Sequence, residues 1–192
     1  MKWDPVCQRW EMDEVKRHAK VELELGDGVQ LRTVRRTDAA AVLTAIRASH
    51  AELAPWMTWL KEDHREADVL SWIDDESLGY RLVMQGDDGQ ILGTAGINVT
   101  DPLHEVGELG YWIRTDQTGR GLATRCTRAL AAHGLTHLGL GRVELLIATS
   151  NKASRSVAER SGARHEGISH SRMLLHGTRH DAHLYAFTTP PR

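Results

Sequence analysis

The sequence predicts a single α/β domain in which helices flank a mixed β-sheet. Strand-like hydrophobic alternation recurs along the chain, helical periodicity separates some of these segments, and short Gly/Asp-rich turns join others. Strands and helices do not alternate one by one throughout, which favours a mixed sheet over a fully parallel one. The 192 residues suit one domain of this kind, and a chain of this size buries about 70% of its unfolded surface.

The N-terminal part predicts an extension, a hairpin and two helices. Residues 1–20 form the extension, and Glu11–Lys20 within it have helical spacing. Apolar residues then alternate around Gly26-Asp27-Gly28, whose backbone freedom suits a tight hairpin turn. The side-chain oxygen of Thr37 or Asp38 is expected to cap the next helix. The two helices are expected over about Ala39–Glu52 and about Arg65–Leu78.

The remainder of the chain predicts six strands and two helices. The strands are expected near Tyr80–Gln85, Ile91–Val99, Val106–Arg114, Val143–Thr149, Ala163–Ser171 and His180–Thr188. The helices are expected over about Gly121–Leu138 and about Ala153–Ser161, with Gly162 ending the second. Residues 190–192 form a short tail, so we expect one domain over residues 21–189.

Composition and charge exclude several classes of function. The formal net charge of −2 and a pI of about 6.6 do not indicate a general nucleic-acid-binding surface. Cys7 and Cys126 are too far apart in sequence for a CxxC pair, which excludes a thiolate zinc cluster or a disulfide scaffold. No apolar run approaches the length of a transmembrane helix, and Asp4 and Glu11 oppose a signal peptide. We therefore expect a cytoplasmic protein without a membrane partner.

Histidines are concentrated in the last third of the chain, but their pattern does not predict a metal site. His180 and His183 are three residues apart on an expected strand, so they face opposite sides of it. No cysteine or carboxylate cluster accompanies them, and a pH-responsive surface is the favoured interpretation. Cys126 lies on the apolar face of its expected helix and is interpreted as a packing residue.

The most informative segment is Glu108–Ala123, where a strand leads through a glycine-bearing loop into a helix. Such a junction directs free amides and the positive end of the helix at one point, which suits a phosphate or pyrophosphate. Glycine at 119 and 121 would let the ligand approach the backbone closely. A tight turn that binds no ligand would have the same sequence pattern. The segment contains neither the Gly-Lys-Ser/Thr of a P-loop nor a Gly-x-Gly-x-x-Gly fingerprint.

Together with Val143–Thr149 and the run Asn151–Gly162, this segment resembles the GCN5-related N-acetyltransferase (GNAT) superfamily, and most closely its RimJ/RimL type of ribosomal-protein N-terminal acetyltransferase. Further matching stretches are Leu53–Trp56, Gly93–Asn98, Glu166-Gly167 and Gly177–Tyr185. The resemblance covers about Val21–Phe187. It implies a mostly antiparallel central sheet flanked by helices, acetyl-coenzyme A (acetyl-CoA) as the donor and a primary amine as the acceptor, without a metal.

The resemblance also implies which residues hold coenzyme A. The pyrophosphate motif falls on Thr118, Gly121 and Ala123, and Thr118 departs from the usual Gln or Arg, which puts the donor preference in doubt. The strand end Ile113–Thr115 is implied to pair with the pantetheine arm. The implied cofactor-binding residues are Ile113, Arg114, Thr115, Thr118, Gly119, Arg120, Gly121, Leu122, Ala123, Thr124, Asn151 and Ser154.

For catalysis, the resemblance points to Glu108 as general base and to Ser154 as the group that protonates the leaving thiolate. Glu108 is equally interpretable as a solvent-facing or salt-bridged strand residue, and Ser154 as a helix cap. Tyr111 and Tyr185 are alternative acids. A backbone amide on the same strand is expected to polarise the thioester carbonyl.

On the acceptor side, Trp56 and Trp59 are expected to flank a cleft that takes a protein N-terminus or a small amine. Further expected acceptor-binding residues are Arg81, Asn98, His104 and Tyr111. Two alternatives stay open: the same fold with another acyl donor such as an aminoacyl-tRNA, and a non-catalytic module that binds acyl-CoA. The resemblance also allows a homodimer.

Overall fold

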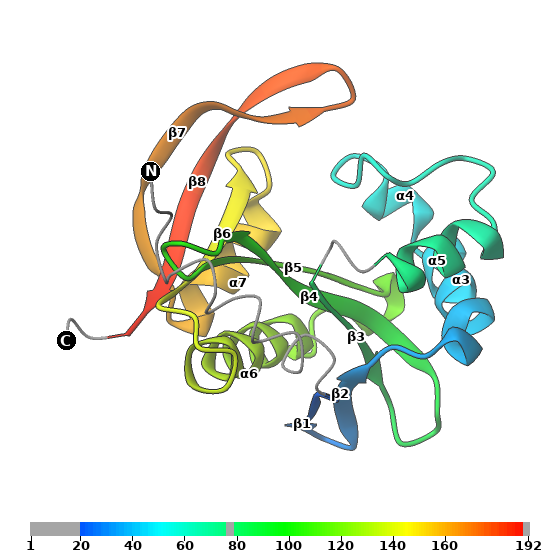
Figure 1. Ribbon diagram of the computed structural model, residues 1–192. Helices are drawn as coiled ribbons and strands as arrows, with labels where there is room; N and C mark the ends of the chain where they lie inside the picture. The colour runs from blue at the N-terminus through cyan, green and yellow to red at the C-terminus, as the bar shows by residue number, and fades with distance from the viewer. Residues whose placement is uncertain (1–19, 76–78, 190–192) are drawn as a thin grey trace, which may run out of the picture.

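The computed structural model of the chain describes residues 20–75 and 79–189. Its centre is an eight-stranded sheet in the order β1-β2-β3-β4-β5-β6-β8-β7 (Figure 1). Every neighbouring pair is antiparallel except β5 and β6, which are parallel. The expected α/β class with a mostly antiparallel sheet is confirmed. The N-terminal extension before Lys20, with its expected helical turns and Cys7, lies outside the described residues, and so does the tail.

The elements follow one another closely along the chain. In order they are β1 (Glu22–Gly26), β2 (Val29–Thr33), η1 (Arg36–Asp38), α3 (Ala39–Ala48), α4 (His50–Leu53), α5 (Glu66–Asp74), β3 (Tyr80–Gln85), β4 (Ile91–Asp101), β5 (Val106–Ile113), η3 (Thr115–Gln117), α6 (Leu122–Thr136), β6 (Arg142–Ala148), α7 (Lys152–Ser161), β7 (Arg164–Leu175) and β8 (Thr178–Thr188). None of the described helices has the length and apolar composition needed to span a bilayer.

The helix expected over Ala39–Glu52 is divided into α3 and α4 at Ser49. Ser49 is fully buried, and its hydroxyl accepts a hydrogen bond from the backbone N–H of Thr115 at 3.0 Å. This hydrogen bond therefore connects the break between α3 and α4 to the segment that directly follows β5. The second expected helix is also shorter than predicted, because α5 ends at Asp74. Residues 76–78 lie outside the described part of the chain.

Asp38 does not cap α3 with its side chain, contrary to the expectation. Its carboxylate instead accepts two hydrogen bonds from the Arg32 guanidinium, each 2.8 Å long, and one from the Arg35 backbone N–H. These donors hold the pKa of Asp38 below its ordinary value, although burial opposes the shift. The buried ion pair fixes the start of α3 against β2.

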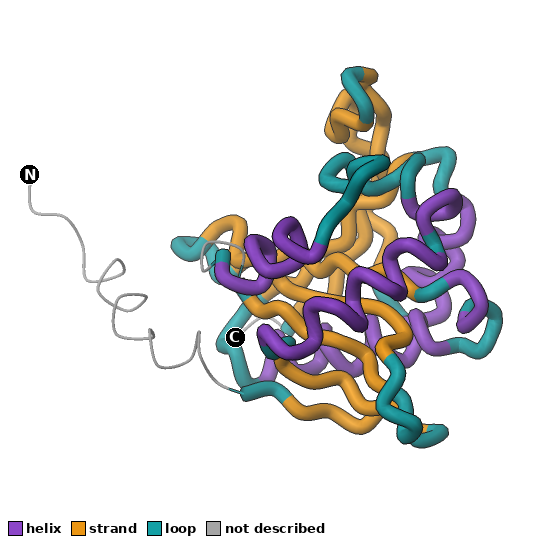
Figure 2. Tube along the Cα trace, turned by 90° about the vertical axis from the view of Figure 1, so that its right-hand side faces the viewer, coloured by secondary structure: helices purple, strands orange, loops and turns teal. Residues whose placement is uncertain are grey.

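Helices lie on both sides of the sheet (Figure 2), and an apolar core lies on each of its faces. On one face α6 packs Leu122, Cys126 and Leu130 against the sheet, which confirms that Cys126 is a packing residue. On the other face α3 and α5 pack around Val83 and Trp112. The sheet thus has a helical layer on each side, as alternating apolar side chains along the strands require.

Candidate functional site

The site begins where β5 and β6 separate. These strands pair only from Val106–Glu108 against Arg142–Glu144, although β5 continues to Ile113 and β6 to Ala148. Beyond Glu108 the two strands diverge and leave backbone groups without a strand partner. In an antiparallel ladder, every second residue of a strand directs its backbone N–H and C=O groups to the same neighbouring strand. Because the Arg114 N–H bonds Leu92 on β4, the backbone groups of Tyr111 and Ile113 face the opening.

The opening leads directly to the glycine-bearing loop. Gly119 and Gly121 have φ values of +77° and +72°, a left-handed conformation that favours glycine. Gly121 is the N-cap of α6 and has no side-chain cap. Among the described residues, no backbone carbonyl accepts a hydrogen bond from the amides of residues 119–124. These free amides and the positive end of α6 are arranged as a candidate anion cradle, which is the role that the sequence analysis expects for this loop.

Of the three strand-end residues implied to hold pantetheine, only Ile113 has its amide toward the opening. The Arg114 amide bonds the Leu92 carbonyl at 2.8 Å, and the Thr115 amide bonds the Ser49 hydroxyl. The hydroxyl of Thr118, the departure from the usual motif, donates to the Thr115 carbonyl at 2.8 Å and stabilises the loop itself. Arg120 lies within the loop, where its guanidinium donates a hydrogen bond of 2.5 Å to the side-chain oxygen of Gln117.

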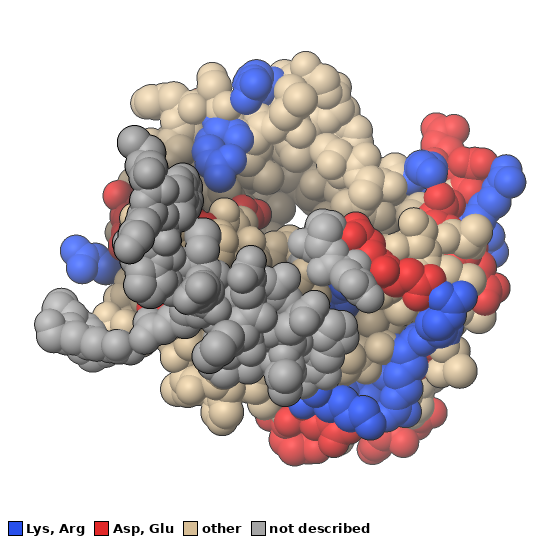
Figure 3. All heavy atoms as spheres, viewed as in Figure 1, with Lys and Arg blue, Asp and Glu red and all other residues tan. Residues whose placement is uncertain are grey.

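A cavity of about 750 Å³ continues from the opening between β4, β5 and β6 on one side and the segment 56–75 on the other. The face of the molecule in Figure 3 is hollowed at this place beneath the β7–β8 hairpin. Seven predicted site residues line the cavity together with Ser154: Trp56, Trp59, Arg81, Asn98, Glu108, Tyr111 and Asn151. The structure thus brings together predicted catalytic and acceptor residues that are about 100 positions apart in sequence.

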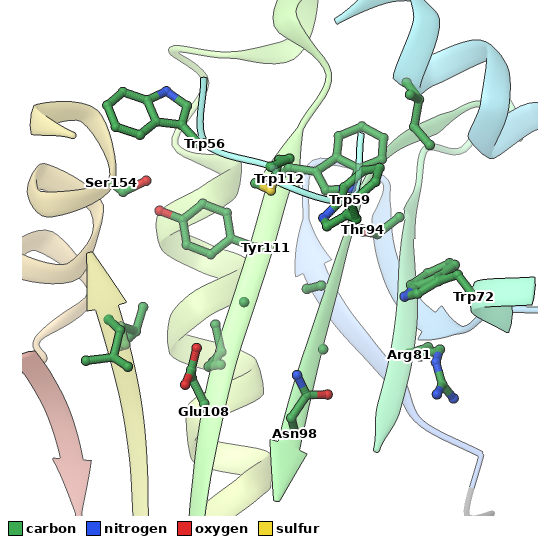
Figure 4. Close-up of a pocket in the computed structure, with 18 of the residues that line it drawn as sticks. Trp56, Trp59, Trp72, Arg81, Thr94, Asn98, Glu108, Tyr111, Trp112 and Ser154 are labelled. Carbon is green, nitrogen blue, oxygen red and sulfur yellow. The ribbon is translucent and has the colours of Figure 1, made fainter. Parts of the chain in front are cut away.

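Glu108 lies at the point where the strands separate, directly opposite Asn98 on β4 and Glu144 on β6 (Figure 4). Burial raises the pKa of Glu108, the negative charge of Glu144 adds to the increase, and Arg172 on β7 opposes it. Glu144 is itself bound to Arg142 at 2.6 Å. The structure therefore places a carboxylate of raised proton affinity in the cavity wall, which suits a general base.

Tyr111 and Ser154 face each other across the opening, and Figure 4 shows the tyrosine hydroxyl directed toward the serine hydroxyl. Burial raises the pKa of Tyr111 to about 12, and Ser154 moderates the increase. Tyr111 is therefore protonated and uncharged near pH 7. Tyr185 is different: its hydroxyl is bound to Glu159 at 2.9 Å, outside the cavity lining.

Ser154 is not the cap of its helix. Asn151 is the N-cap of α7, and its side-chain oxygen accepts a hydrogen bond from the Ser154 backbone N–H at 3.0 Å. The Ser154 side chain is therefore not used for capping. Capping by Asn151 instead fixes the first turn of α7, which positions Ser154 at the cavity.

One end of the cavity is aromatic and is lined by Trp59, Trp72 and Trp112. Trp59 is 44% exposed, and its ring is tilted by 59° relative to the His64 ring at a centroid distance of 5.5 Å, whereas Trp112 is buried beneath α3 and α5. Arg81 lies at the far edge with its side chain directed away from Glu108, 3.8 Å from Asp75 (Figure 4). The sequence analysis missed several lining residues, namely Thr94, Trp72, Trp112, Met173 and Leu175.

His104 lies outside the cavity, contrary to its assignment as an acceptor residue. It is in the turn between β4 and β5, where its ring Nδ1 is 2.8 Å from the Asp101 carboxylate. Among the described residues, no group of three or more His, Cys, Asp or Glu side chains is arranged to hold a metal ion. His165 and His183 do meet, at 3.0 Å between ring nitrogens on β7 and β8.

Three comparisons with known proteins agree on the family. The family described as acetyltransferase (GNAT) domain matches residues 29–164. The putative ribosomal N-acetyltransferase YdaF of Bacillus subtilis is 25% identical over 172 residues, which cover 85% of this chain and 92% of YdaF. The structure of Mycobacterium smegmatis RimJ in complex with CoA-disulfide is 30% identical, with a TM-score of 0.72 and coverage of 88% and 86%. The microcin C7 self-immunity acetyltransferase MccE, solved with acetyl-CoA and AMP, has the same fold at 20% identity, a TM-score of 0.78 and coverage of 87% and 96%.

Proposed function

This chain belongs to the acetyltransferase (GNAT) domain family and is an acyl-CoA-dependent N-acetyltransferase, and we propose that its acceptor is the α-amine at the N-terminus of a polypeptide. The observation that carries the proposal is the opening between β5 and β6, which joins an anion cradle to a cavity containing Glu108, Tyr111 and Ser154. A donor and an acceptor can meet there without a covalent enzyme intermediate.

The donor half is formed by the loop and the strand ends. The amides of residues 119–124 and the charge of Arg120 would hold the pyrophosphate, and the backbone of Tyr111 and Ile113 would pair with the pantetheine arm. The residues present fit this ligand, since the positive φ at Gly119 and Gly121 leaves the amides exposed without an overlying Cβ. When bound, acetyl-CoA supplies an activated acyl thioester.

Glu108 would act as the general base. An amine reaches the enzyme mostly as an ammonium ion and must lose a proton before it can attack a carbonyl carbon. The raised pKa of Glu108 makes the carboxylate a better acceptor for that proton, and Asn98 on the adjacent strand is placed to orient the amine. The proton moves from the amine nitrogen to a Glu108 carboxylate oxygen, directly or through one water.

Tyr111 would supply the proton that the departing thiolate takes up, and the second proton that the attacking nitrogen loses would return through water to the Tyr111 oxygen. Its hydroxyl is buried at the opening, and its pKa of about 12 keeps it protonated at neutral pH. Ser154, which faces it, would either relay the proton or orient the hydroxyl. These roles assign the two ends of the reaction to opposite sides of β5.

A polypeptide N-terminus as acceptor is supported by the relatives, because YdaF is named a putative ribosomal N-acetyltransferase. A small amine is a second candidate, favoured by the shape of the site. The cavity of about 750 Å³ is covered by the β7 residues Met173 and Leu175, so a compact acceptor would fit beneath them. An aminoacyl-tRNA donor receives no support from the family or from these relatives.

The test is an acetylation screen with acetyl-CoA and a panel of amines, in which mass spectrometry detects the acetylated product. The panel contains peptides with different N-terminal residues, their N-blocked counterparts, lysine side chains and small amines. We expect free peptide N-termini to be acetylated and N-blocked peptides to remain unmodified. Acetylation of small amines alone would favour the second candidate, and binding of acetyl-CoA without any product would indicate a non-catalytic module.

A further inference from the structure

The hairpin formed by β7 and β8 bends over the acceptor side of the cavity. Between the paired positions Ser169↔Ala182 and Met173↔His180, β7 advances four residues while β8 advances two. The extra residues form a bulge, and Ser171 within it has a positive φ of +51°. A bulge bends the strand that carries it. The far half of the hairpin therefore curves across the sheet edge, as the orange ribbon in Figure 1 shows.

Asp181 on β8 holds this bulge in place. One of its carboxylate oxygens accepts a hydrogen bond from the Ser171 backbone N–H at 2.8 Å, and the other is 2.9 Å from the His170 ring. Arg179 donates to the Ser171 carbonyl at 3.1 Å. The hydrogen bonds from the Ser171 amide and the His170 ring lower the pKa of Asp181, so the carboxylate that holds the bulge is charged near neutral pH.

The tip of the hairpin reaches the other rim of the cavity. His176 and Gly177 form a two-residue turn with φ values of +47° and +80°. In this conformation the Nε2 atom of His176 donates a hydrogen bond of 2.8 Å to the backbone carbonyl of Ala54. Ala54 directly precedes the segment containing Trp56, whereas Leu175 lies next to His176. Both neighbours line the cavity, so this bond joins its two rims.

We propose that His176 is a specificity-determining residue for the acceptor. Its bond to Ala54 holds the hairpin tip as a roof, under which a small amine fits completely. A polypeptide acceptor has a chain that must leave the cavity, so its entry requires the roof to lift. One exposed hydrogen bond is weak enough to break when a long acceptor enters. It is also strong enough to favour a small acceptor over a long one. The inference rests on the proposed acetyl transfer, because it concerns the acceptor of that same site.

The first experiment compares His176→Ala with wild type on two acceptors that share their N-terminal residue: an amino-acid amide and a long peptide. Removal of one net hydrogen bond predicts that the kcat/KM ratio of long to short acceptor rises about three- to tenfold. His180→Ala is the matched control, since it removes a histidine from the same hairpin on β8, opposite Met173. An unchanged ratio in His176→Ala, or an equal change in His180→Ala, would overturn the proposal.

A second measurement does not depend on turnover. Hydrogen–deuterium exchange followed by mass spectrometry is measured in wild type, His176→Ala and His180→Ala. We expect faster exchange in residues 173–178 and 54–59 of His176→Ala alone, because the bond between the rims is lost. If no amine is acetylated by wild type, the proposed function fails while this measurement still tests the roof. Identical exchange in all three proteins would show that the bond does not hold the hairpin.

Discussion

At the scale of single residues, the chemistry of the site centres on Glu108. It occupies the last paired position before β5 and β6 separate, so its side chain lines the cavity at the point where the two strands diverge. Arg142 forms ion pairs with both Glu144 and Glu166, so the Glu144 carboxylate that lies across from Glu108 has a cationic partner. Burial remains the main reason for the raised pKa of Glu108.

Glu108→Gln is expected to lower kcat about 100-fold near pH 7, because the amide cannot accept the proton of the attacking ammonium. In wild type, kcat/KM should fall as the pH drops through the raised pKa of Glu108, since the protonated carboxyl is no longer a base. The loss in the variant should be smallest at high pH, where the amine is already neutral. The measurement is a pH profile of both proteins, and superimposable profiles would remove Glu108 from the mechanism.

The same variant gives a control on folding. The pKa of Glu108 is raised in the folded state above its ordinary 4.5, so its charge costs stability once the pH exceeds that value. Glu108→Gln should therefore have a higher Tm than wild type at pH 7, and the difference should vanish as the pH falls below about 4. A lower Tm at pH 7 would mean that the carboxylate has a structural role, and the loss of activity would then need another explanation.

Sequence reasoning located residues that belong to a recognisable run and missed residues that converge from separate elements. Glu108 and Tyr111 were found because they lie in one strand that leads to the glycine-bearing loop. Thr94 and Trp72 were missed, because only the pairing of β4 with β5 and the packing of α5 bring them to the cavity. His104 shows the opposite case. It was expected at the cavity because it is close to β4 in sequence, but the turn directs its side chain to Asp101.

At the scale of elements, the first turn of α7 positions Ser154. Asn151 caps this turn through the Ser154 amide. Asn151→Ala should lower the free energy of unfolding by about 1 kcal/mol and raise the KM for acetyl-CoA several-fold, because the first turn loses its fixed geometry. Thermal unfolding and steady-state kinetics measure the two effects. Ser150→Ala, at the exposed neighbouring position, is the control, and equal stability of both variants would contradict the assignment of the cap.

Most strands were predicted to within a few residues, since alternation and glycine-containing turns are local signals. Two elements depart from local signals for tertiary reasons. The division between α3 and α4 is coupled to a contact from Ser49 to Thr115, 66 positions away. The bulge in β7 depends on Asp181 of the partner strand. Neither contact can be predicted from the local sequence of the element whose shape it determines.

At the scale of the whole molecule, one parallel pair in an otherwise antiparallel sheet creates the site. A parallel connection needs a crossover, and α6 provides it between β5 and β6. The N-terminus of this crossover helix therefore lies beside the opening of the sheet. The free amides at residues 119–124 and the cavity thus arise from one topological feature.

Calorimetric titration of acetyl-CoA into wild type, Gly121→Glu and Gly139→Glu determines whether the glycine-bearing loop holds the acyl donor. Gly121 and Gly139 have φ values of +72° and +74°, so both substitutions impose a similar backbone strain, but only the first puts a negative charge in the anion cradle. We predict saturable binding to wild type and Gly139→Glu and no measurable binding to Gly121→Glu. Equal affinity of the two variants, or no binding to wild type, would contradict the central claim that this loop holds the acyl donor.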